Sequence, residues 1–390
     1  MKITIIGWYG TETIGDRAIL AGLFSFFHRS VGDFEIKLGS LHPFFSERTI
    51  SEDYSFYKEI IGKDFIVDIF NSRNSKELLN AIANSDLVVM GGGPLMDLNE
   101  LFMVEYAFKK AHKLGIKTAI MGCGIGPLFH KKYRKSVLEV TKNSDLTVLR
   151  DNKSKSNLKD IYREFNVDFD EAKTHTSFDP SVECALFFNK LCAGASAKYI
   201  AINLRAFPSE YGRDIDPAQI NDALKQTVGA LSNVYQENEI KLIPMHYFHI
   251  GGDDREFLNR IALDLNRDNI TVQNSNLSLI DTMEVYANAY FNIGMRFHSV
   301  VLQTISSGKN FVFDYTEPKK GKISGFLHDI DGDHFYADRY ISLHENEITA
   351  DMVVNVNRQF CYDETDVKSR LSIYVERLNE FKNQVLTCGR

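Results

Sequence analysis

The most constraining feature of this sequence is a short segment, residues 86–90, whose last four residues are apolar and which runs directly into three glycines. A strand that is apolar at consecutive positions must be covered on both faces, which is typical of the parallel sheets of α/β domains. A predicted helix over 100–113 follows, and then a second apolar strand over 117–121 that also ends in a glycine-rich turn. Residues 86–126 therefore predict a strand–helix–strand unit of a parallel sheet.

The same alternation runs through most of the chain. Two stretches, 41–61 and 165–196, show no regular pattern and are expected to be irregular. Strands are predicted at 2–6, 34–38, 65–69, 146–149, 199–204, 240–244, 270–272, 290–293 and 310–313. Helices are predicted at 16–27, 75–83, 131–142, 154–164, 217–235, 254–265, 279–287 and along the amphipathic C-terminal segment that begins near 367.

The alternation restarts near residue 199, which predicts two domains. A chain of 390 residues, 44% of them hydrophobic, is long enough to bury two cores. We expect an N-terminal Rossmann-like domain over 1–190, a C-terminal Rossmann-like domain over 191–355, and a helix over 356–390 that packs across both. Two such domains facing each other across a cleft resemble the layout of the GT-B glycosyltransferases.

Charge and cysteine usage narrow the class of protein. The formal net charge of −7 disfavours nucleic-acid binding that depends on neutralising phosphates. Five scattered cysteines without a Cys-x-x-Cys pair favour reduced thiols over a disulfide framework or a zinc site. The apolar start at Ile3 is too short for a signal-peptide core, and no apolar run reaches the ~20 residues of a membrane-spanning helix. We expect a cytoplasmic protein with at most peripheral contact at the inner face of the membrane.

Residues 294–299, Gly-Met-Arg-Phe-His-Ser, place an arginine and a histidine between a predicted strand and a predicted helix. In an open α/β sheet that junction faces the crevice beyond the carboxyl ends of the strands, where ligands bind. The start of the helix adds N–H donors that favour an anion. The alternative is that Arg296 pairs with a carboxylate and His298 caps the helix.

Other polar residues stand at comparable strand ends. Several cations at one edge of an acidic protein indicate an anionic ligand, because the guanidinium matches carboxylate or phosphate. A histidine among them can move a proton near neutral pH. The set comprises Asp16, Arg150, Arg205, His246, Arg296, His298 and Lys322, with the glycines Gly15, Gly91, Gly92, Gly93, Gly124 and Gly126.

Common catalytic motifs are absent. The first glycine loop is not Gly-x-Gly-x-x-Gly, and there is no Walker A, His-Glu-x-x-His or Gly-x-Ser-x-Gly segment. Asp253 and Asp254 are adjacent acids at a predicted helix start, where caps and first-turn charges are common. We therefore predict no metal site and no cofactor.

Taken in order, these segments resemble the polysaccharide pyruvyl transferase family. The resemblance rests on Gly-Asp at 15–16, the glycines at 91–93, Gly-x-Gly-Ile-Gly-Pro at 122–127, Arg150, Arg205, Met-Arg-Phe-His at 295–298, Asp-Tyr at 314–315 and Lys-Ile-Ser-Gly-Phe at 322–326. Two departures stand out: the family's Asn-x-Gly-Asp-Glu is Thr-Ile-Gly-Asp-Arg here, and about four residues are inserted between Tyr315 and Lys322.

The resemblance implies transfer of the pyruvyl group of phosphoenolpyruvate to two hydroxyls of one sugar, giving a cyclic ketal. Arg150, Arg205, Arg296 and Lys322 would bind the donor, and His298 and Asp16 would do the acid/base work. The glycines at 15, 91–93, 124 and 126 would give the acceptor access to the backbone. The implied acceptor is a glycan, for example a polyprenyl-diphosphate-linked oligosaccharide, in surface polysaccharide biosynthesis.

Two other functions remain open on the sequence. The same two-domain layout would serve a GT-B glycosyltransferase or another sugar-nucleotide enzyme, and a non-catalytic sugar-binding protein is the third possibility. For membrane contact, residues 41–45 with Lys37 and Arg48 are the candidate surface, because Phe44 and Phe45 stand next to cations. The alternative is that both rings pack inside the first domain.

Overall fold

The computed structural model describes residues 1–192, 198–211, 215–318, 321–332, 334, 339–345, 348, 353 and 359–388. The chain divides by its internal contacts into two compact units. The first comprises Met1–Glu12, Asp16–Cys184 and Glu364–Arg390, and the second comprises Thr13–Gly15 and Ala185–Asp363. The C-terminal helix thus groups with the first unit, whereas the sequence analysis set it apart after residue 355, a position outside the described residues.

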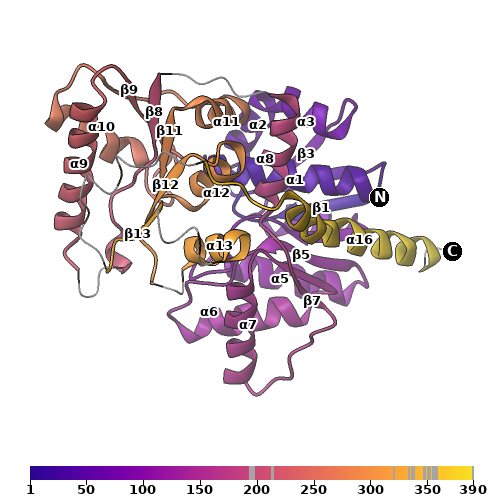
Figure 1. Ribbon diagram of the computed structural model, residues 1–390. Helices are drawn as coiled ribbons and strands as arrows, with labels where there is room; N and C mark the ends of the chain where they lie inside the picture. Colours follow the sequence, from indigo (N-terminus) through magenta and orange to yellow (C-terminus); the bar gives the residue numbers. More distant parts are fainter. Residues whose placement is uncertain are drawn as a thin grey trace. The chain divides into compact units, whose positions relative to one another are not determined.

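The first unit contains a seven-stranded, all-parallel sheet in the order β3-β2-β1-β4-β5-β6-β7. Figure 1 labels β1, β3, β5 and β7 of this sheet. Its strands are β1 (Lys2–Ile6), β2 (Glu35–Ser40), β3 (Val67–Asn71), β4 (Leu87–Met90), β5 (Lys117–Cys123), β6 (Leu146–Leu149) and β7 (Thr174–Thr176). Its helices are α1 (Ile14–Ser30), α2 (Pro43–Glu52), α3 (Tyr54–Ile61), α4 (Ser75–Ala83), α5 (Leu101–Lys113), α6 (Lys131–Lys142), α7 (Asn152–Glu164), the start of α8 (Pro180–Leu191) and α16 (Glu364–Cys388).

Helices cover both faces of this sheet. One face packs in a single apolar core against α4, α5, α6 and α7. Helix α16 packs with α1, where the ring of Tyr374 stacks on Phe26 at 4.4 Å between centroids, and the Tyr374 hydroxyl donates to the carbonyl of Phe178 at 2.7 Å. Because helices cover both faces, β4 and β6 are buried at every position, and all their residues except Thr147 are apolar.

The second unit contains a six-stranded, all-parallel sheet in the order β10-β9-β8-β11-β12-β13. Chain order reverses between β8 and β11, so the crevice at their carboxyl ends is the expected ligand position. Its strands are β8 (Tyr199–Ile202), β9 (Glu239–Leu242), β10 (Ile270–Val272), β11 (Phe291–Gly294), β12 (Asn310–Asp314) and β13 (Tyr340–Ser342). Its helices are α9 (Pro217–Val234), α10 (Asp254–Leu265), α11 (Leu279–Asn288), α12 (Phe297–Ser306) and α13 (Lys322–Asp331), with a short 3₁₀ turn η1 (Ser209–Tyr211).

The prediction of two Rossmann-like α/β domains is confirmed, while two stretches predicted as irregular are regular. Residues 41–61 form α2 and α3: Pro43 fills the first turn of α2, and Gly62 ends α3 in the left-handed conformation at φ 73°. Within 165–196, β7 joins the sheet edge and Pro180 opens α8. Short polar segments such as β7 carry no apolar period, so pattern reasoning misses them.

Two smaller corrections affect the glycine segments. Helix α1 starts at Ile14, so Gly15 lies in its first turn and not in a loop. Strand β5 extends to Cys123, with a register irregularity at Gly122, so that glycine belongs to the strand. None of the helices in the described part of the chain is both long enough and apolar enough to span a bilayer.

Candidate functional site

Polar side chains gather at the carboxyl ends of the central strands of the second unit. Arg205 follows β8, His246 follows β9, and Arg296 follows β11 as the N-cap residue of α12. Tyr315 follows β12, and Lys322 is the first residue of α13. Since β9, β8, β11 and β12 are neighbours in one parallel sheet, these five side chains come from one edge, at the point where strand order reverses.

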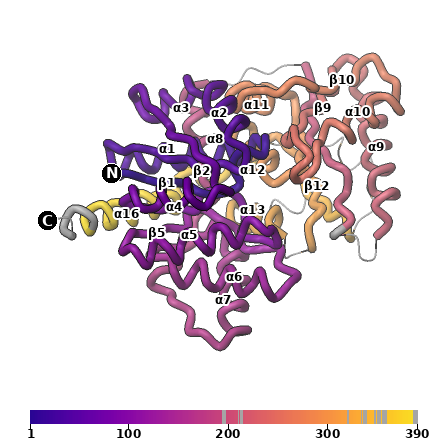
Figure 2. Tube along the Cα trace, turned by 180° about the vertical axis from the view of Figure 1, so that it is seen from behind, coloured from indigo at the N-terminus to yellow at the C-terminus, as the bar shows by residue number. Residues whose placement is uncertain are grey.

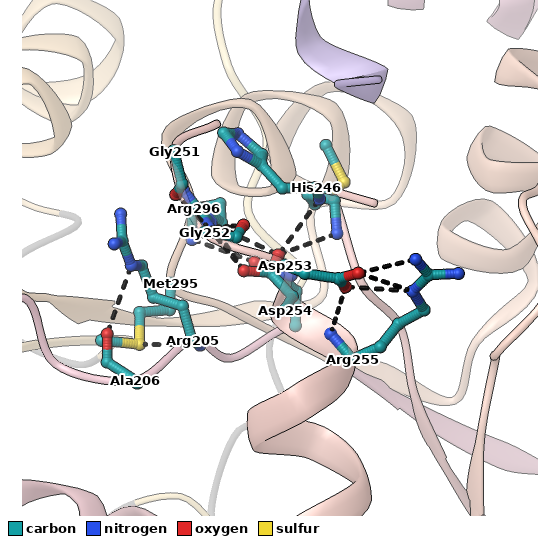
Figure 3. A network of polar contacts seen from close by, with 12 residues as sticks. Arg205, Ala206, His246, Gly251, Gly252, Asp253, Asp254, Arg255, Met295 and Arg296 are labelled. Atoms are coloured by element: carbon teal, nitrogen blue, oxygen red, sulfur yellow. Dashed lines mark hydrogen bonds and ion pairs between the residues drawn. The ribbon is translucent and has the colours of Figure 1, made fainter. Parts of the chain in front are cut away.

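Arg296 is held by a buried carboxylate (Figure 3). Its Nη2 donates to Oδ1 of Asp254 at 2.5 Å and its Nε donates to the same oxygen at 3.0 Å. Nη2 also donates to the carbonyls of Gly251 and Gly252, each at 3.2 Å. These contacts use Nε and Nη2 of Arg296 and hold its guanidinium in one orientation, and a guanidinium can bind an anion through its remaining N–H groups.

Asp254 links this arginine to the neighbouring strand end. Its second oxygen accepts the backbone N–H groups of Met245 at 3.0 Å and His246 at 3.2 Å. Adjacent Asp253 caps α10 by accepting the N–H of Arg255, and it pairs with the Arg255 guanidinium at 2.6 Å (Figure 3). The sequence interpretation of both acids as cap and first-turn charges is correct, but it missed that Asp254 orients Arg296.

Arg205 and Lys322 both lie close to the Tyr315 ring. The Arg205 guanidinium is 5.3 Å and the Lys322 ammonium 5.9 Å from the centroid of that ring. Arg205 forms no ion pair with any residue that the structure describes; its Nε donates to the carbonyl of Ala206 at 3.3 Å. A guanidinium that has no carboxylate partner and lies near another guanidinium is stabilised when an anion binds.

The pKa shifts in this cluster report its positive potential. Burial raises the pKa of Tyr315, but the charges of Lys322, Arg205 and Arg296 outweigh burial and lower it to about 8. Burial lowers the pKa of His246 well below its ordinary value, and Arg296, Arg205 and Lys322 lower it further. His246 is therefore a neutral imidazole near pH 7, and its Nδ1 has no hydrogen-bond partner among the described residues.

His298 lies in the first turn of α12, and Gly15 makes room for it. A Cβ added to Gly15 would stand 1.9 Å from Nδ1 of His298, so no side chain fits there. The backbone N–H of Ile14 donates to the carbonyl of Met245 at 3.1 Å, and Thr13 forms a bridge with His246. Segment Thr13–Gly15 is thus fixed to the same strand end as His246, next to the His298 ring.

In the first unit, Gly124 leaves room for the Arg150 side chain, as Gly15 leaves room for His298 in the second. Arg150 follows β6 and is buried, with Nε 3.4 Å from Asp151 and Nη1 3.8 Å from Asp179. A Cβ on Gly124 would stand 2.3 Å from Nη2 of Arg150. Asp16 also belongs to this unit, in the first turn of α1, where its carboxylate accepts from the Thr11 hydroxyl at 3.3 Å.

The three glycines after β4 have a packing reason that the sequence analysis did not find. A Cβ on Gly91 would meet Leu23 at 2.5 Å, and one on Gly93 would meet the Trp8 ring at 2.4 Å. Gly92 has a positive φ of 149°, a backbone conformation that glycine adopts without strain. At Gly126, with φ 105°, the nearest atoms to such a Cβ are the Leu128 nitrogen at 3.7 Å and the Asn157 amide nitrogen at 3.9 Å, which is ordinary van der Waals contact without overlap. Acceptor access through these glycines stays a prediction.

The structure brings together Arg205, Arg296 and Lys322 with His246 and His298 in the second unit, and it places Arg150 and Asp16 in the first. The sequence analysis assigned no binding or catalytic role to three residues of the cluster, Asp254, Tyr315 and His246. His246 and Tyr315 could be found from their positions at strand ends, whereas nothing in the sequence identifies the partner of Arg296. Among the described residues, no group of three or more His, Cys, Asp or Glu side chains could hold a metal ion.

Replacing Gly15 with alanine should displace the His298 ring, an effect that differs from the general preference of helices for alanine over glycine. The new methyl group would overlap the imidazole, so we expect the His298 ring signals to move in NMR spectra and the protein to lose stability. Gly229→Ala is the matched control, because Gly229 is also helical and a Cβ there meets only the flexible end of Leu265 at 3.0 Å. Alanine is favoured over glycine in a helix interior by up to about 1 kcal/mol, so the Gly229→Ala control should gain stability. Equal gains in stability at both positions would contradict the close packing of Gly15 on His298.

Removing the charge of Asp254 should be much more costly than removing that of its neighbour. Asp254→Asn keeps an oxygen for the two backbone N–H groups but leaves buried Arg296 without a counter-charge, a loss of about 3–5 kcal/mol in unfolding free energy. Asp253→Asn keeps the cap and breaks only a partly exposed pair, worth about 1 kcal/mol or less. Urea denaturation of both variants measures the difference, and equal losses would rule out the orienting role of Asp254.

Comparisons with known proteins agree with this arrangement. A family model described as polysaccharide pyruvyl transferase matches residues 14–316. No curated protein gives a significant match. Among solved structures, UDP-GlcNAc 2-epimerase from Methanocaldococcus jannaschii superposes with a TM-score of 0.60 at 15% identity, covering 97% of this chain and 100% of that one. UDP-GlcNAc 2-epimerase from Neisseria meningitidis bound to UDP-GlcNAc gives 0.54 at 12% identity, covering 98% and 94%.

At these identities the solved structures establish the fold alone, two Rossmann-like domains of the GT-B type. The family match is more informative, because it runs from the first turn of α1 to just beyond Tyr315. It includes Gly15 beside His298, Gly124 beside Arg150, and the Arg205–Arg296 pair of cations, and it leaves out Lys322. The chain belongs to the polysaccharide pyruvyl transferase family.

Proposed function

We propose that this protein transfers the pyruvyl group of phosphoenolpyruvate to two hydroxyls of one sugar in a glycan, forming a cyclic ketal and releasing phosphate, in surface polysaccharide biosynthesis. The observation that carries the proposal is the cluster of Arg205, Arg296 and Lys322 around Tyr315, at the reversal of strand order in the second unit. Phosphoenolpyruvate carries a carboxylate and a phosphate, two anionic groups that suit a cluster of three cations in which Asp254 orients Arg296.

The chemistry requires two additions at one carbon. A sugar hydroxyl attacks carbon 2 of the enolpyruvyl group, and carbon 3 gains a proton and becomes a methyl group. The second hydroxyl then attacks carbon 2, and the bond from carbon 2 to the phosphate oxygen breaks. Two C–O bonds and one C–H bond form, while the C=C π bond, one C–O bond and two O–H bonds break. There is no net oxidation or reduction, because one hydroxyl proton replaces the proton taken up by carbon 3 and the other leaves with phosphate or solvent.

Two histidines in the cluster differ in what they can contribute. His298, at the start of α12 against Gly15, is the group that we assign to proton transfer at carbon 3. His246 is kept neutral by burial and by the cations, so it is suited to accept a hydrogen bond and not to donate a proton. Arg296, oriented by Asp254, would bind the donor, with Arg205 and Lys322 holding its other anionic group.

The first unit would supply the acceptor side. Asp16 in the first turn of α1 is our candidate for orienting a sugar hydroxyl, and Gly126, where no neighbour lies closer than 3.7 Å to an added Cβ, is the candidate for acceptor access to the backbone. Arg150 was assigned to the donor on sequence grounds; its buried position beside Asp151 and Asp179 makes it equally suited to shape the loop of Gly124. The acceptor that we propose is a glycan such as a polyprenyl-diphosphate-linked oligosaccharide, with no cofactor beyond the donor substrate.

A sugar-nucleotide enzyme is the second candidate, because a diphosphate would also suit these cations and UDP-GlcNAc 2-epimerases have the same fold. Thermal stability distinguishes the two. Phosphoenolpyruvate at ~100 Kd should add about 2.7 kcal/mol, while pyruvate or UDP-GlcNAc at the same concentration should add much less. Stabilisation by UDP-GlcNAc alone would favour the second candidate.

Variants then separate binding from turnover. Arg205→Gln should weaken the phosphoenolpyruvate shift, whereas Arg255→Gln, which removes an arginine already paired with Asp253, should leave it unchanged. His298→Ala should keep the shift but reduce phosphate release with a glycan panel by ~10²–10⁴-fold. Normal turnover in His298→Ala would leave only a sugar-binding or structural role for this residue.

Donor affinity should fall as the pH rises through about 8. Below that value Tyr315 is neutral and the cations are fully effective; above it, the phenolate places a negative charge next to Lys322, Arg205 and Arg296 and competes with the donor. Calorimetric titration of phosphoenolpyruvate between pH 6.5 and 9.5 measures this dependence. Tyr315→Phe cannot ionise, so its affinity should stay level over the same range, and a parallel fall in both proteins would assign the effect to another group.

A further inference from the structure

Helix α5 exposes aromatic and basic side chains along one line. Phe102, Tyr106, Lys109 and Lys113 are spaced four, three and four residues apart, which places them on one face of a helix. Phe102 is 39% and Tyr106 36% exposed, and the Lys110 ammonium lies 5.4 Å from the Tyr106 ring centroid. The opposite face, with Leu101, Val104, Phe108 and Ala111 among others, is buried in the core of the first unit.

Helix α6 continues this surface. Lys132, Lys135 and Lys142 are exposed along one face, and Lys131 is exposed beside them. Just before the helix, Phe129 is 47% exposed. The described part of the chain thus presents both apolar rings and lysines here, while the buried face of α6 packs into the same core as that of α5.

Two contacts show that the faces of α5 and α6 form one surface. Lys109 reaches across the helices to Glu139 at 2.8 Å. At the other end, Phe102 stacks on Tyr133 at 5.3 Å, and the Lys132 ammonium lies 4.6 Å from the Tyr133 ring centroid. Figures 1 and 2 show the two helices side by side in both views. We call this surface, with Phe129, the α5/α6 face.

The α5/α6 face has a charge opposite to that of the whole protein. The two helices carry eight lysines and arginines against two glutamates, a net charge of +6 in a chain whose net charge is −7. The single arginine, Arg134, is already engaged by Glu164 and by the carbonyls of Leu128 and Phe129. The charge presented to a partner is therefore that of lysines, which act as mobile point charges and not as bidentate forks.

We propose that the α5/α6 face docks on the surface of an anionic lipid bilayer. Lysines above an apolar, aromatic band are what a helix pair lying in the interface uses: the rings enter the headgroup region and the cations attract the lipid charge. A second copy of this chain is a poor partner, because two faces of the same strong positive charge repel. Nucleic acid is less favoured, because Tyr133 already covers one face of the Phe102 ring and leaves fewer ring faces on which bases could stack.

The surface chosen from the sequence differs from this one. Phe44 on α2 is 69% exposed, and the Arg48 guanidinium lies 5.7 Å from the centroid of the Phe45 ring. Helix α2, however, carries Glu47 and Glu52 against the single cation Arg48, so it offers no net attraction to anionic lipid. Membrane contact through Phe44 stays a separate prediction.

Flotation with lipid vesicles tests the proposal independently of the proposed activity. The full-length protein should float with vesicles containing phosphatidylglycerol, should not float with pure phosphatidylcholine, and should be released by ~0.5 M salt, because exposed charges are then screened within a few Å. No flotation, or equal flotation with both lipids, would overturn the proposal. Flotation abolished by Phe44→Ser but not by changes on the α5/α6 face would overturn it as well.

Charge-matched variants locate the surface. Changing Lys113, Lys131, Lys132 and Lys135 to glutamine should lower the partition coefficient by about fivefold for each lysine. The control changes Lys58, Lys63, Lys159 and Lys173 to glutamine; these lysines pair with Asp or Glu elsewhere in the first unit, and the loss of net charge is the same. Equal losses in both variants would overturn the assignment to the α5/α6 face.

A second pair of variants tests the aromatic contribution. Phe129→Ser should weaken flotation, and Leu263→Ser, which removes a 78% exposed side chain from α10, should not. Two further measurements test the other partners: binding of a synthetic oligonucleotide, and self-association by sedimentation velocity. Tight oligonucleotide binding without flotation would assign the face to nucleic acid, and self-association abolished by the four-lysine variant would assign it to a second copy; either result overturns the bilayer proposal.

Discussion

The buried ion pair between Arg296 and Asp254 is the interaction on which the arrangement of the second unit's site depends. A buried guanidinium is costly unless it is paired, and here one carboxylate pairs with it while accepting two backbone N–H groups from the end of β9. The ion pair therefore fixes three things at once: the plane of Arg296, the path of the chain at His246, and the start of α10. Such pairs add little net stability compared with apolar packing, so a reason for this one must be sought in what it orients.

That orientation matters because positive charge is concentrated in this cluster. The charges of Lys322, Arg205 and Arg296 together are strong enough to lower the pKa of Tyr315, a group that burial alone would shift upward. They likewise keep His246 neutral. Like charges held at one strand edge raise the free energy of the empty protein, and a ligand with two anionic groups lowers it. In the proposed function, phosphoenolpyruvate would be such a ligand.

The sequence predicted the parts of this structure that depend on repeated patterns. Consecutive apolar residues predicted β4, and short, mostly apolar runs predicted β6, β8 and β11, after which Arg150, Arg205 and Arg296 mark the strand ends. Pairing across long sequence separations could not be predicted: Asp254 is 42 residues from Arg296, and its assignment as a first-turn acid of α10 was correct yet incomplete. Helices α2 and α3 were missed because their limits are set by Pro43 and Gly62, which are equally common in loops.

The glycines show how an accurate observation can support an incomplete interpretation. Their concentration after strands indicated close approach of the backbone to a ligand, which is one use of a residue without Cβ. In the structure, the atoms that approach Gly15 and Gly124 are those of His298 and Arg150. Each glycine lets a polar side chain rest directly on the backbone, where it has fewer alternative rotamers and loses less entropy when a substrate binds. The glycine and its polar partner are therefore a single functional unit, although they lie 283 residues apart in one case and 26 in the other.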